Sequence, residues 1–186
     1  SPSLWRDIKV YDDHAFIVSE AGGHGLQIVK LDALLELPLD QVTQIEPTAF
    51  YGGFGNAHNI MINEETGYAY AIGTSTFSGG LHILDLENPQ NPVLVGSYDE
   101  SYSHDVHPIV YQGPDEDYFG REMVICFNGY SGIYIVDAED KSDVTAVAQL
   151  DYAQSGYTHQ GYVGENHRYC FFNDELDEQN FGNNTR

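Results

Sequence analysis

The sequence predicts an all-β fold, and three observations carry this prediction. The 186 residues include 14 tyrosines and 19 glycines, a composition that favours strands joined by tight turns. Short apolar runs alternate with turn residues along the chain. A similar short sequence motif recurs about every 50 residues, which is the period of propeller blades. We therefore expect residues 1–186 to form a β-propeller region with about three and a half four-stranded blades of a larger propeller.

The recurring motif consists of a small residue, a histidine and a polar residue at the start of a strand-like run. Its copies are Ala57-His58-Asn59, Ser103-His104-Asp105 and Thr158-His159-Gln160. A similar run begins at Arg6, with arginine in place of histidine. These starts divide the chain into approximate units at 6–47, 57–98, 103–151 and 158–186, of which the last is incomplete.

The first unit shows three strand-like runs. Residues 8–11 alternate, and Asp12-Asp13 supplies a turn to a second run at 15–18. A glycine-rich turn then leads to a third run at 26–31. Residues 32–39 are expected to form a short helical turn or a loop.

The second and third units share a four-strand plan. Pro89 and Pro92 precede the last strand of the second unit, which fits an edge strand because proline cannot donate to a central ladder. The fourth unit shows only two strands. A sheet cut short leaves an unprotected edge, so we expect remaining blades or a partner chain to complete the propeller. The expected strands are 58–62, 68–72, 81–86, 93–98, 105–111, 122–127, 132–137 and 144–150.

Two of these runs, Leu81-His82-Ile83-Leu84-Asp85-Leu86 and Gly132-Ile133-Tyr134-Ile135-Val136-Asp137, resemble the LVIVD repeat. The wider order of motifs is similar to the choice-of-anchor B family of bacterial surface proteins. This resemblance implies a β-propeller that is secreted or held at the bacterial cell surface, and it implies no settled catalytic activity. The motifs that carry it are Ser3-Leu4-Trp5-Arg6-Asp7-Ile8-Lys9-Val10, Gly55-Asn56-Ala57-His58-Asn59-Ile60, Ser103-His104-Asp105, Tyr157-Thr158-His159-Gln160-Gly161 and Asn173-Asp174-Glu175-Leu176-Asp177-Glu178.

The charge of the chain limits its partners. There are 29 acidic and 7 basic residues, so the formal net charge is −22. Such a field repels nucleic acid and anionic membranes. The alternative is that the charge serves only to keep the protein soluble. We also expect no membrane insertion, because no apolar run reaches the length of about 18 residues that a spanning helix needs. The expected partner is a protein, a small molecule or a glycan on the axial face.

The repeated histidines are candidate metal ligands. Strand heads in a propeller face the central channel, so His58, His104 and His159 would converge there. Three imidazoles suit zinc, copper or iron, and Asp105 is a further metal candidate in the channel. Asp105 and Asn59 could also orient the rings. The alternative is that these histidines bond neighbouring backbone and only fix the blades.

A second candidate site is the acidic loop with Asp174, Glu175 and Asp177. Calcium takes six to eight oxygen ligands and would neutralise such a cluster. The loop lacks the glycine and ligand spacing of an EF-hand, and a solvated acidic loop is the alternative. The two cysteines, Cys126 and Cys170, both lie in apolar runs. They are expected to be buried free thiols, with a disulfide left open.

These features lead to three functional interpretations. The first is an extracellular or cell-surface binding or scaffold module. The second is a metal-dependent enzyme with a histidine-ligated transition metal in the channel. The third is a structural repeat stiffened by calcium. Nucleophilic catalysis has little support because the sequence has no Gly-x-Ser-x-Gly elbow.

Overall fold

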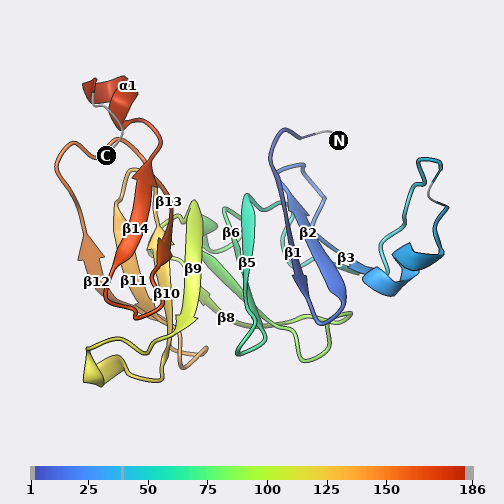
Figure 1. Cartoon of the computed structure of the whole chain (residues 1–186), viewed down its shortest axis with the longest axis horizontal. Coiled ribbons are helices and arrows are strands. Elements are labelled where there is room, and N and C mark those ends of the chain that lie inside the picture. The colour runs from blue at the N-terminus through green and yellow to red at the C-terminus, as the bar shows by residue number, and fades with distance from the viewer. Residues whose placement is uncertain (1–2, 39, 183–186) are drawn as a thin grey trace.

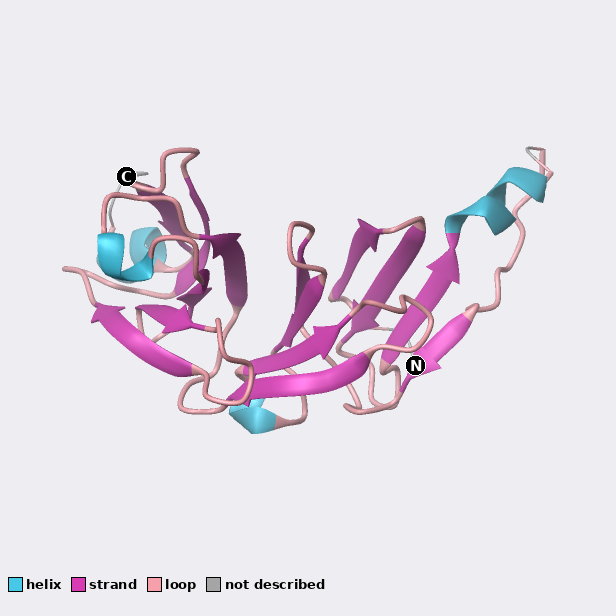
Figure 2. Cartoon of the chain, turned by 90° about the horizontal axis from the view of Figure 1, so that it is seen from below, coloured by secondary structure: helices cyan, strands magenta, loops and turns pink. Residues whose placement is uncertain are grey.

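The computed structural model describes residues 3–38 and 40–182, and these residues form four antiparallel sheets. Three sheets have four strands and the last has two, so the expected all-β plan is confirmed. Figure 1 shows the sheets following one another along the long axis of the molecule. Figure 2 shows that they form an open arc. Residues 183–186 of the expected fourth unit lie outside the described residues.

The first sheet is ordered β1-β2-β3-β4. The β1–β2 turn at Asp12 and Asp13 has φ angles of 44° and 58°, as the two central residues of a type I′ hairpin turn require. The short helical segment η1 (Leu31–Glu36) lies where a helical turn or loop was expected. The outer strand β4 lies just beyond the expected unit of 6–47. The four strands are β1 (Arg6–Tyr11), β2 (His14–Ser19), β3 (Leu26–Lys30) and β4 (Ala49–Tyr51).

The second and third sheets follow the same up-and-down plan. Each strand pairs antiparallel with the next, and both outer pairs contain a register shift after the middle of the third strand. Two single-turn helices, η2 (Phe77–Gly79) and η3 (Glu116–Tyr118), lie in the loops. The strands are β5 (Asn59–Asn63), β6 (Tyr68–Ile72), β7 (Leu81–Asp85), β8 (Val93–Tyr98), β9 (Asp105–Val110), β10 (Glu122–Phe127), β11 (Ile133–Asp137) and β12 (Thr145–Leu150).

Within the described residues, the fourth sheet consists of β13 (Thr158–Val163) and β14 (Cys170–Asp174), followed by the short helix α1 (Asp177–Phe181). Among the described residues, no helix has the length and apolar character needed to cross a membrane. Both cysteines are free thiols, but only Cys126 is buried. The expectation that Cys170 is buried is wrong, because β14 is the edge of an incomplete sheet.

Apolar side chains fill three layers, one between each pair of neighbouring sheets. Alternation along each strand sends successive side chains to opposite faces, so each middle sheet contributes to two layers. The inner strands β1, β5, β9 and β13 contact one another in chain order. Representative members are Phe16 and Leu84 in the first layer, Ile83 and Val124 in the second, and Phe127 and Val163 in the third.

A buried ion pair ties the second sheet to the third. Glu122 at the start of β10 is 2% exposed, and its Oε1 accepts hydrogen bonds from Asn63 and Thr66, both at 2.7 Å. Lys141 donates to Oε2 at 2.8 Å, and its ammonium lies 4.1 Å from the centroid of the Tyr68 ring. The carboxylate is thus held by the second sheet on one oxygen and by its own sheet on the other.

Candidate metal centre

The three repeated histidines lie in a row at the heads of neighbouring sheets. His58 directly precedes β5, His104 precedes β9, and His159 is the second residue of β13. The ring centroids of His58 and His104 are 4.2 Å apart, and those of His104 and His159 are 4.8 Å apart. Residues about 50 positions apart in the sequence therefore lie in one row because they occupy the same place in successive sheets.

The small residue before each histidine has a packing reason. Ala57, Ser103 and Thr158 are all fully buried, so a larger side chain at these positions would have no room. Gly73 also faces the row, since a Cβ built on it would lie 2.4 Å from the Cβ of His58. Its φ of +58° is a conformation that favours glycine, so both the space and the backbone require this residue.

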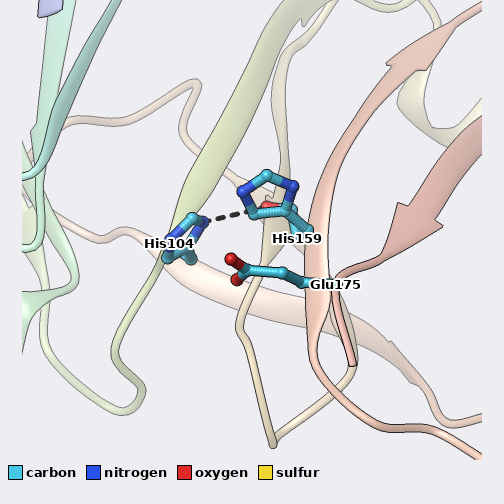
Figure 3. A group of neighbouring side chains, drawn as sticks. All are labelled: His104, His159 and Glu175. Atoms are coloured by element: carbon cyan, nitrogen blue, oxygen red, sulfur yellow. Dashed lines mark hydrogen bonds between the residues drawn. The ribbon is translucent and has the colours of Figure 1, made fainter. Parts of the chain in front are cut away.

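Glu175 joins His104 and His159 from the segment that follows β14. One ligand atom from each of these three side chains lies within 4.8 Å of the other two. Figure 3 shows the carboxylate directed toward the two imidazoles. Zinc bonds of about 2.0–2.1 Å place tetrahedral donor atoms roughly 3.4 Å apart, so side-chain movements within about 1 Å would close the group around an ion.

His104 is held as a neutral imidazole. Its Nδ1 lies 3.2 Å from the carbonyl oxygen of His159, and because a carbonyl only accepts, Nδ1 carries the proton. Burial, together with the neighbouring His58, lowers the pKa of His104 to about 4. A donated N–H to a backbone carbonyl is the contact that fixes the ring of a metal-binding histidine, with the other nitrogen keeping its lone pair.

His58 stands beside this cluster with a carboxylate partner of its own. Its Nδ1 lies 2.6 Å from Oε1 of Glu20, the residue after β2. Glu20 is one of two acidic residues at the cluster that sequence reasoning did not connect to the histidines; Glu175 is the other. Neither has a repeat signal, because each lies in a loop rather than at the repeated strand head.

Tyr157 packs against the cluster and interacts with a second tyrosine, Tyr102. The rings of Tyr157 and His104 lie nearly perpendicular, with centroids 5.2 Å apart, and the Tyr157 hydroxyl interacts with that of Tyr102. Burial raises the pKa of both phenols, so both keep their protons at neutral pH. A signal was present in the sequence: Tyr102 and Tyr157 each lie two residues before a repeated histidine.

Asp105 is not part of the group of ligand atoms formed by His104, His159 and Glu175. Its Oδ1 accepts hydrogen bonds from Asn59 at 3.0 Å and from the Val106 amide at 2.8 Å. Burial raises the pKa of Asp105 to about 6. Asp105 and Asn59, expected to orient the rings, instead bond to each other and link the inner strands of the second and third sheets.

The three acidic-loop residues do not form a joint group of ligand atoms in the part of the chain that the structure describes. Asp174 accepts from the Tyr152 hydroxyl and from the amides of Gly156, Tyr157 and Leu176. Burial acts to raise the pKa of Asp174, but these hydrogen bonds outweigh it and hold the pKa below its usual range. Asp177 is buried within α1. The loop thus uses Asp174 to fix its own shape and presents Glu175 to the histidines.

Comparison with known proteins gives one match. Residues 54–100 match the family model of the LVIVD repeat. This stretch covers β5 to β8 and the loop that leads into them. No curated protein and no solved structure matches the chain. The second sheet of this protein, which carries His58 at its head, therefore matches the LVIVD repeat.

Proposed function

We propose that this chain is part of a β-propeller that acts as a binding or scaffold module, outside the cell or at a bacterial cell surface. We further propose that its ligand site is a transition-metal centre at the heads of the third and fourth sheets. The observation that carries the proposal is the convergence of His104, His159 and Glu175 within 4.8 Å from two sheets. The LVIVD repeat and the arc of sheets support the propeller.

The donor set suits zinc, copper or iron. Two imidazoles and one carboxylate are common ligands of these ions, and three protein ligands leave a coordination position open. A ligand with a carboxylate, imidazole or hydroxyl group would occupy that position. The metal would thereby give the axial face a recognition point for a protein, a small molecule or a glycan. Calcium fits less well, because imidazole is not among the oxygen ligands that it takes.

Elemental analysis tests the centre directly. Protein purified without chelator or nickel resin should contain about one zinc, copper or iron ion per chain. The variants His104→Ala, His159→Ala and Glu175→Gln should each lose it. His167→Asn is the matched control, because His167 lies in the β13–β14 turn, has a φ of +51° that asparagine tolerates, and takes no part in the cluster. Metal-free protein, or metal retained by all three variants, contradicts the proposed centre.

A metal-dependent enzyme is the second candidate function, and the His58–Glu20 pair favours it. A carboxylate bonded to Nδ1 orients an imidazole so that its other nitrogen can take a proton, and this ring lies beside that of His104. Glu20→Gln should leave the metal content unchanged but lower any hydrolysis of p-nitrophenyl esters. No ester hydrolysis above that of the free metal ion excludes this class of reaction.

The proposed location and partners need their own test. Antibodies against this chain should label intact cells of the source organism if the protein is exposed outside them. Binding of nucleic acid is disfavoured by the net charge of −22. Labelling only after the cells are opened contradicts the surface location, and it leaves the metal test unaffected.

A further inference from the structure

Equivalent positions in the second and third sheets differ sharply in exposure. Ile83 in β7 and Ile135 in β11 occupy the same place in the repeat, yet Ile83 is fully buried and Ile135 is 37% exposed. Tyr98 and Leu150 end the outer strands of the same two sheets, and they are 2% and 55% exposed. The apolar face of the third sheet is therefore uncovered at its outer half.

This difference in exposure arises because the third sheet covers the second sheet. Val136 and Ala138, on and just after β11, and Ala146 on β12 pack in the layer that covers Ile83 and Tyr98. These are outer strands of the following sheet. The fourth sheet supplies only β13 and β14, so among the described residues nothing equivalent covers Ile135 and Leu150.

The uncovered region is a groove of about 810 Å³ between the third sheet and β14. Its wall is mostly apolar, and it also contains Asp115, Arg168 and the exposed Cys170. In the third sheet, Arg121 pairs with Asp137 at the end of β11, at 2.7 Å. Arg168 thus offers a cation to an incoming strand that ends in aspartate. The groove is lined in part by Ile125, Ile135, Val147, Leu150 and Phe172.

We propose that this groove and the free edge of β14 bind a two-stranded antiparallel hairpin with the chemistry of the chain's own β7–β8 hairpin. The first strand pairs with β14 by backbone hydrogen bonds, as in strand addition to a sheet edge. Its apolar side chains fill the groove against Ile135 and Leu150, and its terminal aspartate meets Arg168. The continuity with the two complete sheet–sheet layers sets this occupant apart from an arbitrary apolar ligand. This proposal is independent of the metal centre.

Alkylation of Cys170 tests the proposal on the chain as it is. Cys170 lines the groove, whereas Cys126 is fully buried and remains unreactive in the folded protein. The probe is a synthetic peptide of residues 79–98. At a peptide concentration near ten times its Kd, Cys170 should react about tenfold more slowly, by mass action. A control peptide with Leu84→Asp and Leu86→Asp removes the side chains that cover the preceding sheet, and it should give no protection.

Two protein variants test whether the protection of Cys170 depends on the groove. Leu150→Asp places a charge on the groove wall at an exposed position, so the protein should fold and lose the protection. Ile8→Asp makes the same kind of change on the exposed face of β1, and protection should persist. No protection by the 79–98 peptide, or equal protection by both peptides, overturns the proposal. It is also overturned if Cys170 becomes protected without peptide as the chain dimerises, since the occupant is then a second copy.

Discussion

Replacing Lys141 with methionine should lower the free energy of unfolding by about 3–5 kcal/mol, because it leaves a buried carboxylate without its cation. Glu122 is 2% exposed, and the side chain of Lys141 is 12% exposed. Methionine keeps the aliphatic stem but loses a charge-assisted hydrogen bond of about 1.5–3 kcal/mol. It also loses the contact with the Tyr68 ring, worth about 0.5–1 kcal/mol. The remainder is the penalty for an unpaired oxygen inside the protein.

Replacing Glu122 instead of Lys141 should lower the free energy of unfolding by less. Glu122→Gln keeps an acceptor for Asn63 and Thr66, and Lys141 can turn toward solvent, so the expected loss is about 1–2 kcal/mol. The double variant should recover much of the Lys141→Met loss, giving a coupling energy of about 1–3 kcal/mol. Guanidinium unfolding followed by far-ultraviolet circular dichroism measures all four proteins. Lys30→Met is the control, because its ion pair with Asp32 is exposed and should contribute little to stability. A Lys141→Met loss no greater than that of Lys30→Met refutes the reasoning.

Three further changes have defined outcomes. Burial lowers the pKa of His82 to about 4, so the folded ring stays neutral while the unfolded ring gains a proton below about pH 6.5. Stability should therefore fall from pH 6.5 to 4 by up to about 1.4 kcal/mol per pH unit more than in His82→Gln, and equal slopes in urea titrations contradict this. Gly73→Ala should cost about 1–3 kcal/mol and shift the nuclear magnetic resonance signals of His58, whereas Gly22→Ala, which meets no neighbour, should be near neutral. Asp174→Asn should lower the melting temperature through about 2 kcal/mol of lost hydrogen bonding and also weaken metal binding through Glu175. An unchanged melting temperature would show that this carboxylate does not organise the loop.

The strands of the second and third sheets could be predicted from the sequence because their signals are local. Each has an alternating apolar run with turn residues on both sides, and the structure places β5 to β12 within two residues of the expected ranges. Strand β4 was missed because it has three residues and follows a long polar connector. Cys170 was misplaced for a different reason: its run is apolar, but its burial depends on strands that the fourth sheet lacks within the described residues.

The candidate site could be predicted only in part. The histidines share a repeat position, so their meeting follows from the repeat alone. Glu175 was seen as one of several acids in a loop, and no local pattern separates it from Asp174. In the β13–β14 hairpin, the amides that precede β13 bind the Asp174 carboxylate, so Glu175 is the residue of the two that faces the histidines. Glu20 has no repeated counterpart, so only the three-dimensional structure connects it to His58.

Among the described residues, the third apolar layer has the fewest buried members of the three, and the candidate metal centre lies across the same junction. His104 heads the third sheet, while His159 and Glu175 belong to the last hairpin. In a row of sheets that contact only their neighbours, each junction has its own stability. An ion bound here would add its binding free energy to the junction with the least apolar burial. The β13–β14 hairpin would then be ordered when metal is bound and loosen when metal is lost, while the other sheets stay packed. The order of this hairpin would therefore depend on the metal concentration.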